Sequence, residues 1–362
     1  MQRTIKVGIL GFGFVGQGVY NIIQEKQTAY QQYKTLNIQV HKILVKDLSK
    51  AERTLPENFD KTLLTDQFSD FFPSFSENNE NENTNDNPNA LDYIFECTVG
   101  EQPALQYLTY ALQQQVSVIT ANKVMFAAHG VALQQLADRV HQNNNNNKRV
   151  LVGYEATVAG GIPIIKTIQR MLPTQSVTKI EGILNGTTNF ILTDLRENIQ
   201  NHKRYAESLK EAQEKGYAEA DPTNDVSGKD AFYKLMILSQ LCFDKMPKWE
   251  EVELIGIETI SPEMINTAME DGGKCYRHVA CIERKIISNN EKEEEVLVAS
   301  VRPLLVSPSH ALYNINGSTN AVAVHTDYLS CVTMVGPGAG SYPTGSAMLE
   351  DLLYMETLQR GY

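Results

Sequence analysis

The chain has few cysteines, five in 362 residues, and no two of them form a C-x-x-C pair. They are widely spaced and comprise Cys97, Cys242, Cys275, Cys281 and Cys331. An odd number at this spacing argues against a disulfide framework and against a zinc cluster. We expect free thiols in a reducing, cytoplasmic environment.

The sequence also lacks an excess of basic residues and any long apolar run. It has 32 Lys and Arg against 43 Asp and Glu, a net charge of -11. A broad electrostatic attraction to nucleic acid or to an anionic membrane is therefore not expected. No stretch approaches the roughly 18 apolar residues of a membrane span, and no export signal is visible. Small-molecule chemistry is the function class that remains.

Hydrophobic residues make up 42% of the sequence, and the length suggests about two domains. In the first part, short apolar runs alternate with stretches of helical periodicity; the runs cover residues 5–10, 38–45, 93–97 and 116–119. This alternation predicts an α/β fold with a Rossmann-type, doubly wound parallel sheet. We assign residues 1–150 to this domain, completed by 336–362, where a glycine loop at 336–340 precedes a capped helix over 344–358.

Residues 151–335 have a different pattern and predict a second, α+β domain. The expected strands cover 177–184, 278–287 and 296–305, the last two as antiparallel neighbours, and the expected helices cover 187–195, 206–214 and 228–242. Two Asn-rich stretches, 76–89 and 142–147, lack apolar content and are predicted to be solvated surface loops.

A dinucleotide fingerprint, G-x-G-x-x-G, directly follows the first predicted strand and opens a helix. It consists of Gly11, Phe12, Gly13, Phe14, Val15 and Gly16. Glycine permits the tight turn and a close backbone approach to a pyrophosphate, and the helix N-terminus supplies free N–H groups. The alternative is a turn in which strand and helix merely pack closely, but the strand and helix context favours cofactor binding.

The end of the second predicted strand bears on the choice between NAD and NADP. A carboxylate there would bind the ribose 2'-hydroxyl of NAD, whereas a cation would bind the 2'-phosphate of NADP. Here the strand ends in Val45-Lys46-Asp47, after an apparent insertion at 27–37 that leaves the register open. Lys46 favours NADP modestly, against the alternative of an ordinary surface lysine.

Two further segments follow predicted strands, where ligands bind in doubly wound sheets. The first is Thr120-Ala121-Asn122-Lys123, and the second runs from Glu155 to Pro163 with two adjacent glycines. A lysine directly after a strand is a candidate site residue. The glycines suggest backbone bending close to a bound group.

Acidic residues are densest in the segment 219–234, which holds Glu219, Asp221, Asp225 and Asp230. Four carboxylates so close together need a cationic partner, a metal or full solvation. Asp230 and Lys234 are spaced i,i+4 on one helix face in the favourable order. A calcium loop is the competing interpretation, but the acids lack the alternating spacing and terminal Glu of an EF-hand.

Six motifs in order make the chain resemble the homoserine dehydrogenase family over nearly its whole length. They are the Gly11 fingerprint, the Lys123 segment, the Glu155 segment, Asn185-Gly186-Thr187-Thr188-Asn189, the 219–234 block and Gly336-Pro337-Gly338-Ala339-Gly340. The departures are the two Asn-rich insertions and Gly345, where the last motif leads one to expect Ala. The resemblance is to the form without an appended regulatory domain.

The resemblance implies NAD(P)-dependent interconversion of L-homoserine and L-aspartate 4-semialdehyde, a step toward threonine and methionine, by a homodimer formed through the second domain. It implies that Lys234 donates the proton, that Asp230 orients it, and that Lys123 stabilises charge on the reacting oxygen. Further implied contacts are, for the substrate, Glu219, Asp225, Gly186 and Thr187; for the cofactor, Lys46, Thr98, Lys123 and Gly338 beside the fingerprint; and for a monovalent cation (Na+ or K+), Glu155 with carbonyls of Val158, Gly160 and Ile162.

Two alternatives stay open on the sequence. A different NAD(P)-dependent amino-acid dehydrogenase of the same architecture would keep the Gly11 fingerprint, but it has no need of the 219–234 block. A non-catalytic dinucleotide sensor would need neither Lys123 nor Lys234.

Overall fold

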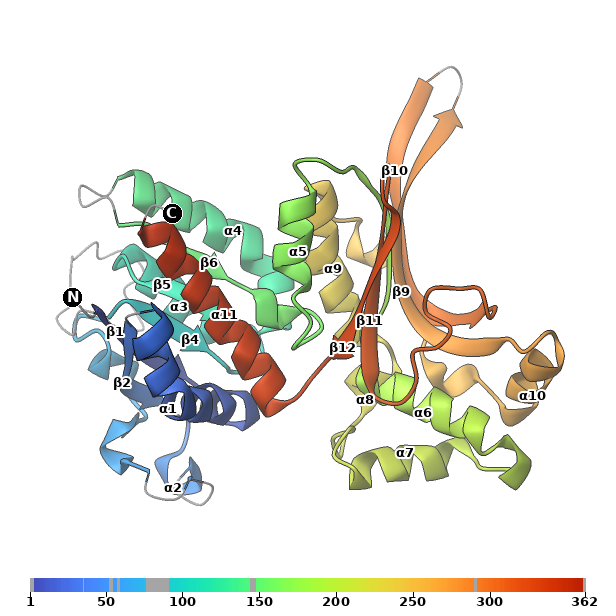
Figure 1. The fold of residues 1–362 in the computed structure, drawn as a ribbon, viewed down its shortest axis with the longest axis horizontal. Helices are drawn as coiled ribbons and strands as arrows, with labels where there is room; N and C mark the ends of the chain where they lie inside the picture. The colour runs from blue at the N-terminus through green and yellow to red at the C-terminus, as the bar shows by residue number, and fades with distance from the viewer. Residues whose placement is uncertain are drawn as a thin grey trace. The chain divides into compact units, whose positions relative to one another are not determined.

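The computed structural model describes residues 3–34, 36–51, 55–56, 59–75, 91–143, 148–289 and 292–360. The chain divides into two compact units (Figure 1). Unit 1 comprises Met1–Thr157 and Gly340–Tyr362, and unit 2 comprises Val158–Ala339. The boundaries therefore fall a few residues after those expected from the sequence, at 157/158 and 339/340.

Unit 1 is built on a six-stranded sheet in which every pair of neighbouring strands is parallel. In chain order the strands are β1 (Arg3–Leu10), β2 (Leu36–Leu44), β3 (Leu64–Thr65), β4 (Tyr93–Glu96), β5 (Ser117–Thr120) and β6 (Val152–Gly153). Their spatial order is β3-β2-β1-β4-β5-β6, which is the strand order of the doubly wound dinucleotide-binding fold. The predicted Rossmann-type sheet is confirmed.

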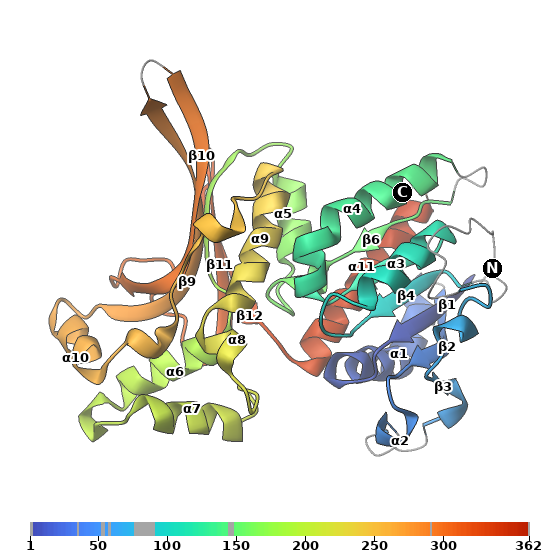
Figure 2. The same cartoon turned by 180° about the vertical axis from the view of Figure 1, so that it is seen from behind.

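Helices cover both faces of this sheet, because alternate strand side chains point to opposite sides. Tyr93 and Phe95 pack in a cluster with side chains of α1 (Phe14–Lys34) and α11 (Ser341–Gln359). Ile94, between them, packs with α3 (Ala104–Gln113) and α4 (Lys123–Gln142), which Figure 2 shows in front of the sheet. Unit 1 also contains the short helix α2 (Leu48–Ala51) and the 3-10 helices η2 (Lys61–Leu63), η3 (Phe68–Asp70) and η4 (Glu155–Thr157).

Helix α1 is longer than the sequence predicts, since most of the apparent insertion at 27–37 is helical. The polar side chain of Gln27 fixes the turn into β2: its amide nitrogen donates to the Ile38 carbonyl at 2.7 Å, and its oxygen accepts from Ile38 N at 3.2 Å. The segment read as an insertion therefore consists mainly of the last turns of a regular helix and the first residues of β2.

Helix α11 packs on α1 in unit 1, as expected. It begins at Ser341 rather than Thr344, and its N-cap residue is Gly340, which has no side chain to cap the helix. Gly345 faces the α1 backbone closely. A Cβ there would lie 2.9 Å from Val19 N and 3.0 Å from the Gly18 carbonyl carbon. This contact explains why glycine stands where alanine is expected.

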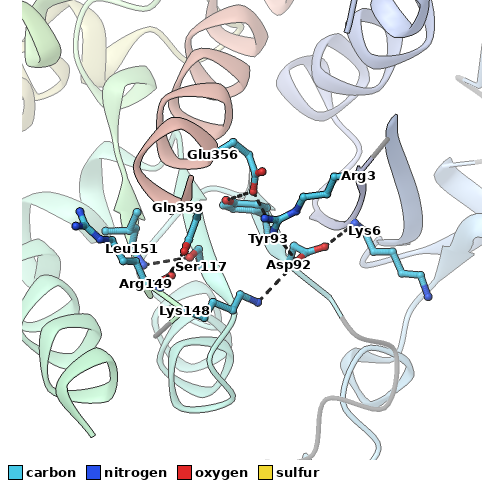
Figure 3. Close-up of polar contacts among 10 residues, drawn as sticks. All are labelled: Arg3, Lys6, Asp92, Tyr93, Ser117, Lys148, Arg149, Leu151, Glu356 and Gln359. Carbon is cyan, nitrogen blue, oxygen red and sulfur yellow. Dashed lines mark hydrogen bonds and ion pairs between the residues drawn. The ribbon is translucent and has the colours of Figure 1, made fainter. Parts of the chain in front are cut away.

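A polar network at the amino end of the sheet connects α11 to the first and fourth strands (Figure 3). The buried Tyr93 hydroxyl donates to Glu356 Oε1 at 2.7 Å, and Arg3 lies 3.2 Å from the same oxygen. Asp92 accepts from Lys6 N at 3.0 Å and lies 3.8 Å from the Lys148 ammonium. The network fixes the last turns of α11 against the sheet.

Unit 2 contains a second six-stranded sheet, ordered β12-β11-β7-β9-β10-β8. Its strands are β7 (Val177–Ile183), β8 (Glu253–Leu254), β9 (Cys275–Asn289), β10 (Lys292–Val306), β11 (Thr319–Thr326) and β12 (Ser330–Pro337). β9 and β10 pair antiparallel, as predicted, and form the long orange hairpin of Figure 1. Gly336 and Pro337, expected in a loop, are the last residues of β12, where they pair with β11.

The helices of unit 2 confirm the predicted α+β character. They are α5 (Ile164–Met171), α6 (Gly186–Glu197), α7 (Tyr205–Glu214), α8 (Thr223–Val226), α9 (Lys229–Phe243) and α10 (Pro262–Glu270), with the 3-10 helices η5 (Ile199–Asn201), η6 (Trp249–Glu251) and η7 (Ile257–Thr259). Neighbouring side chains of β9 reach different helices. Arg277 donates to Asn189 and Thr193 of α6, whereas His278 contacts Gly228 at the start of α9.

The first Asn-rich stretch, 76–89, lies outside the described residues, as does 144–147 of the second. Within the described part of the chain, no helix is both long and apolar enough to span a membrane.

Candidate active site

The glycine fingerprint forms a tight turn between β1 and α1. Gly11 has a φ of +89°, which favours glycine, and a Cβ on Gly16 would lie 2.1 Å from the Gly11 carbonyl oxygen. By contrast, a Cβ on Gly13 would meet no atom within 4 Å. The turn is thus closed on the protein side and open at Gly13, as required for a backbone that a pyrophosphate approaches at a helix N-terminus.

The loop after β2 holds two exposed residues of opposite charge, Lys46 and Asp47. Asp47 Oδ1 accepts from Ser49 Oγ at 2.8 Å and from Lys50 N at 3.1 Å, at the start of α2. The hydrogen bond from the Ser49 hydroxyl, with that from Lys50 N, lowers the pKa of the Asp47 carboxyl. One oxygen of Asp47 is therefore engaged within its own loop, and Lys46 supplies an exposed cation beside it.

Glu96, which the sequence analysis did not single out, lies at the carboxyl end of β4 and is 0% exposed. Its Oε1 accepts from Thr98 N at 2.7 Å and from Thr98 Oγ1 at 2.5 Å, and its Oε2 accepts from Thr120 Oγ1 at 2.6 Å. Burial raises the pKa of this carboxyl, although the hydrogen bonds oppose that shift. Thr98, a predicted cofactor residue, is thus held by a buried acid.

Lys123 is the first residue of α4, at the carboxyl end of β5 as the sequence predicts. Asn122 caps this helix: its Oδ1 accepts from Met125 N at 3.1 Å, and its Nδ2 donates to the Gly100 carbonyl at 2.6 Å. Both Lys123 and the Gly11 turn therefore lie at the carboxyl edge of the unit 1 sheet, where doubly wound folds bind their ligands.

The segment predicted to hold a cation begins in unit 1 with Glu155, which is 1% exposed. The Glu155 backbone N–H donates to Asp351 Oδ2 of α11 at 2.8 Å. Among the described residues, no group of three or more His, Cys, Asp and Glu side chains could hold a metal. A cation here would depend mainly on backbone oxygens.

The remaining residues of that segment lie in unit 2. Ala159 and Gly160 both have positive φ, +55° and +50°. A Cβ on Gly160 would lie 2.6 Å from the carbonyl oxygen of Gly338, so the Gly160 turn and the last glycine segment approach each other closely. Gly338 in turn adjoins the buried side chain of Asn320.

The catalytic candidates of unit 2 meet at the start of α6. The Lys234 ammonium donates to Asp230 Oδ2 at 2.8 Å and to the Leu184 carbonyl at 2.6 Å. Asn185 donates to Asp225 Oδ1 at 2.8 Å and to Asp230 Oδ2 at 3.0 Å. Lys234 and Asp230 are 8% and 9% exposed, so neither is a solvated surface residue.

Asn185 fits this position because it also caps α6. Its Oδ1 accepts from Thr188 N at 2.9 Å, which leaves both amide hydrogens for the two aspartates. Asn185 belongs to one of the six motifs, but the sequence alone assigns it no role. Its position before a predicted helix start is the signal that indicates a capping residue.

Three predicted substrate residues of unit 2 have different environments. Gly186 is the first residue of α6. The Thr187 hydroxyl donates to the Tyr217 carbonyl, so the Thr187 side chain holds the loop that follows α7. The side chain of Glu219 is exposed, and within the described residues it makes no hydrogen bond to the Lys234 cluster. The structure brings together Asp225, Asp230 and Lys234, but not Glu219.

The strand order and the open glycine turn define the class of protein: a dinucleotide-binding protein of the doubly wound fold. Residues 11–146 match the family model described as homoserine dehydrogenase, NAD binding domain, and residues 163–353 match that described as homoserine dehydrogenase. The chain belongs to the homoserine dehydrogenase family.

Individual relatives agree with this assignment. The chain is 35% identical to the homoserine dehydrogenase of Bacillus subtilis over 97% of its own length and 73% of that protein. It resembles the crystal structure of a homoserine dehydrogenase from Thiobacillus denitrificans with a TM-score of 0.82 and 31% identity, over 99% of this chain and 74% of that one. A hyperthermophilic archaeal homoserine dehydrogenase in complex with NADPH matches with a TM-score of 0.70 and 25% identity, over 98% of both chains.

Proposed function

We propose that this chain oxidises L-homoserine to L-aspartate 4-semialdehyde, and catalyses the reverse reaction, with NAD(P) as the hydride carrier. The observation that carries the proposal is the buried cluster of Lys234, Asp230 and Asn185. Reduction of an aldehyde requires a proton donor for the developing alkoxide, and a lysine held by two acceptors is suited to that role.

Lys234 acts as the proton donor in reduction and as the acceptor in oxidation. An ammonium group has three N–H donors, and within the described residues Lys234 uses one on Asp230 and one on Leu184. The third is directed by the other two and serves the substrate oxygen. Asp230 balances the buried charge and fixes the ammonium.

The amino acid's own charges are held by residues around this cluster. Asp225, fixed by Asn185, and Glu219 bind the substrate ammonium, while backbone groups of Gly186 and Thr187 contribute polar contacts at the helix N-terminus, since the Thr187 hydroxyl is engaged elsewhere. The side chain of Glu219 is exposed, so its carboxylate is accessible to the substrate ammonium.

The Gly11 to Gly16 turn binds the cofactor, with Thr98, Lys123 and Gly338 as further contacts. The bound cofactor would accept the hydride in homoserine oxidation and would supply it in the reverse reaction. The α1 N-terminus receives the pyrophosphate. Lys123 stabilises negative charge as it develops on the reacting oxygen. Lys46 favours NADP through the 2'-phosphate, and the engaged oxygen of Asp47 supports this preference.

A monovalent cation, Na+ or K+, binds the carbonyl oxygens of Val158, Gly160 and Ile162, with Glu155 as the nearby acid in the sequence. The two successive left-handed residues, Ala159 and Gly160, support this proposal, because they interrupt regular secondary structure beside these carbonyls. The Ile162 carbonyl accepts from Ile164 N at 2.7 Å, so it would bind the ion through its second lone pair. Activity in Na+, K+ and a bulky organic cation at equal ionic strength tests it; equal rates in all three would contradict it.

The enzyme works as a cytoplasmic homodimer formed through unit 2. Two apolar side chains on one face of the unit 2 sheet, Val298 and Val335, are 45% and 52% exposed, which supports an interface on this face. Sedimentation of the purified chain tests the dimer, and a monomer at micromolar concentration would contradict it.

The deciding experiment follows the absorbance of reduced nicotinamide with homoserine and either NAD or NADP. Homoserine-dependent reduction supports the proposal, and the two cofactors assayed in parallel give the preference. If other amino acids are oxidised faster than homoserine, the chain is a different dehydrogenase of this architecture. If the folded protein binds a dinucleotide but reduces neither with any amino acid, it is a sensor.

A further inference from the structure

The two loops at the carboxyl edge of the unit 1 sheet share one buried acid. Thr98, after β4, donates to Glu96 through both its backbone N–H and its hydroxyl. Thr120, at the end of β5, donates its hydroxyl to the other oxygen of the same carboxylate. Glu96 therefore connects two loops that are separate in the sequence.

The chain of hydrogen bonds continues from Thr120 to the start of α4. Thr120 Oγ1 accepts from Asn122 N at 2.9 Å, and Asn122 caps the helix whose first residue is Lys123. Asn122 also donates to the Gly100 carbonyl at 2.6 Å, in the loop after β4. A shift of the Glu96 carboxylate would therefore move both Thr98 and the backbone that carries Lys123.

This arrangement costs stability, since a fully buried carboxyl gives up its hydration and its hydrogen-bond donors in the described residues are neutral groups. The donors of Glu96 in the described residues are hydroxyl, amide and backbone groups of Thr98, Thr120 and Asn122. An apolar residue at the end of β4 would pack there at lower cost. The acid is thus better explained by what it positions than by the stability of the fold.

We propose that Glu96 is a positioning residue, which fixes Thr98 and the Lys123 end of α4 for the bound dinucleotide and the reacting oxygen. The proposal rests on the proposed function, because it assumes that Thr98 and Lys123 act at the cofactor. Through Glu96, hydrogen bonds connect the loop after β4 with the end of β5. The glycine fingerprint does not make this connection.

The test is Glu96→Gln, which keeps the shape but replaces one acceptor oxygen by a donor. Either Thr98 or Thr120 then loses its acceptor. Hydrogen bonds to charged groups are strong enough that we expect the dinucleotide Kd to rise about tenfold and kcat to fall about tenfold. The homoserine KM is expected to stay within about twofold of the wild-type value, since unit 2 is unchanged.

Glu356→Gln is the matched control, because it makes the same change to a buried acid of the same unit. Glu356 is 2% exposed and accepts from Tyr93, the first residue of β4 (Figure 3). Glu96 is the last residue of the same strand. We expect this variant to lose thermal stability but to keep a Kd within about twofold of wild type. An equal loss of affinity in both variants, or an unchanged Kd and kcat in Glu96→Gln, would overturn the proposal.

Thr120→Val provides a second route if Glu96→Gln does not fold. It leaves the carboxylate in place but removes both the hydroxyl donor to Glu96 and the acceptor of Asn122 N. We expect kcat to fall at least fivefold, and wild-type kcat would overturn the proposal. The dinucleotide Kd is measured without homoserine. If the wild-type chain binds the cofactor but does not oxidise homoserine, that result contradicts the proposed function and leaves the role of Glu96 in cofactor binding to be judged from the Kd values.

Discussion

The side-chain amide of Asn185 donates to Asp230 Oδ2 at 3.0 Å, and this is the same oxygen that accepts from the Lys234 ammonium. Asp230 is therefore oriented by two donors from different elements, one at the start of α6 and one on α9. Because Leu184, adjacent to Asn185, also accepts from Lys234, a single turn before α6 fixes both the lysine and its carboxylate.

The first prediction concerns the proton donor. Replacing Lys234 with Ala removes the only ammonium of this cluster within the described residues, and kcat should fall about 100-fold or more, the usual share of general acid catalysis. Dinucleotide binding should persist, because the Gly11 turn belongs to unit 1. Lys229→Ala, an exposed lysine on the same helix, is the control and should keep wild-type kcat. A folded Lys234→Ala enzyme with normal kcat would remove Lys234 from the mechanism.

A second prediction separates substrate binding from cofactor binding. Glu219→Gln should raise the homoserine KM about tenfold, because the substrate ammonium loses a charged partner, and should leave the dinucleotide Kd unchanged. Titration of both ligands measures this, with Glu214→Gln, another exposed acid of unit 2, as the control. An unchanged homoserine KM would show that Asp225 holds the ammonium without Glu219.

Cofactor choice should depend on Lys46. In Lys46→Ala the KM for NADP should rise about fivefold and that for NAD should change little, since only NADP carries the 2'-phosphate. The effect should shrink as salt is added, because an exposed charge pair is screened. Lys26→Ala removes an exposed charge from α1 and serves as the comparison. Equal changes for both cofactors would contradict the assignment.

The stability of unit 2 should depend on pH through His278. Burial lowers the pKa of this imidazole from 6.5 to about 4, although a hydrogen bond with the Ile255 carbonyl opposes the shift. The folded protein favours the neutral imidazole, whereas the unfolded chain takes up a proton near pH 6.5. The stabilising contribution of the neutral imidazole is therefore fully present above pH 6.5 and is lost as the pH falls to about 4. This difference in pKa between the unfolded and folded states corresponds to a change in the free energy of unfolding on the order of 3 kcal/mol.

The measurement is urea unfolding followed by the fluorescence of Trp249, the one tryptophan of the sequence, which packs on Phe232 of α9. Between pH 6.5 and 4 the free energy of unfolding should fall more steeply for wild type than for His278→Gln, which keeps a donor but cannot titrate. Parallel pH profiles for the two proteins would refute a role for His278.

The strands of the fold could be predicted from the sequence where hydrophobic periodicity was strong. Residues such as Tyr93 and Phe95 are buried on one face and Ile94 on the other, so the run 93–97 predicts a central strand. The two-residue strands β3 and β8 are too short to have a period. The end of α1 is not predictable because its polar face resembles a loop. The role of Gln27 becomes clear only from its hydrogen bonds with Ile38 of β2, 11 residues further along the chain.

The candidate site divides in a similar way. Asp230 and Lys234 were predictable because their i,i+4 spacing on a helix places them together, and the structure joins them. Glu96 was not predictable, since an acid at the end of a strand has the same local sequence whether it is solvated or buried. Its partner Thr120 is 24 residues away, and no local pattern records that contact.

Helix α11 also decides when unit 1 can fold during synthesis. Ala347, Met348, Leu352 and Met355 complete the same core as Ile5, Val7 and Ile9, the residues of the first strand. Translation delivers α11 more than 300 residues after β1. Unit 2, whose residues 158–339 form an uninterrupted segment, is fully synthesised before that core can close. The strand β1 therefore leaves the ribosome long before the helix that covers it, and the apolar face of the nascent sheet stays exposed for that time.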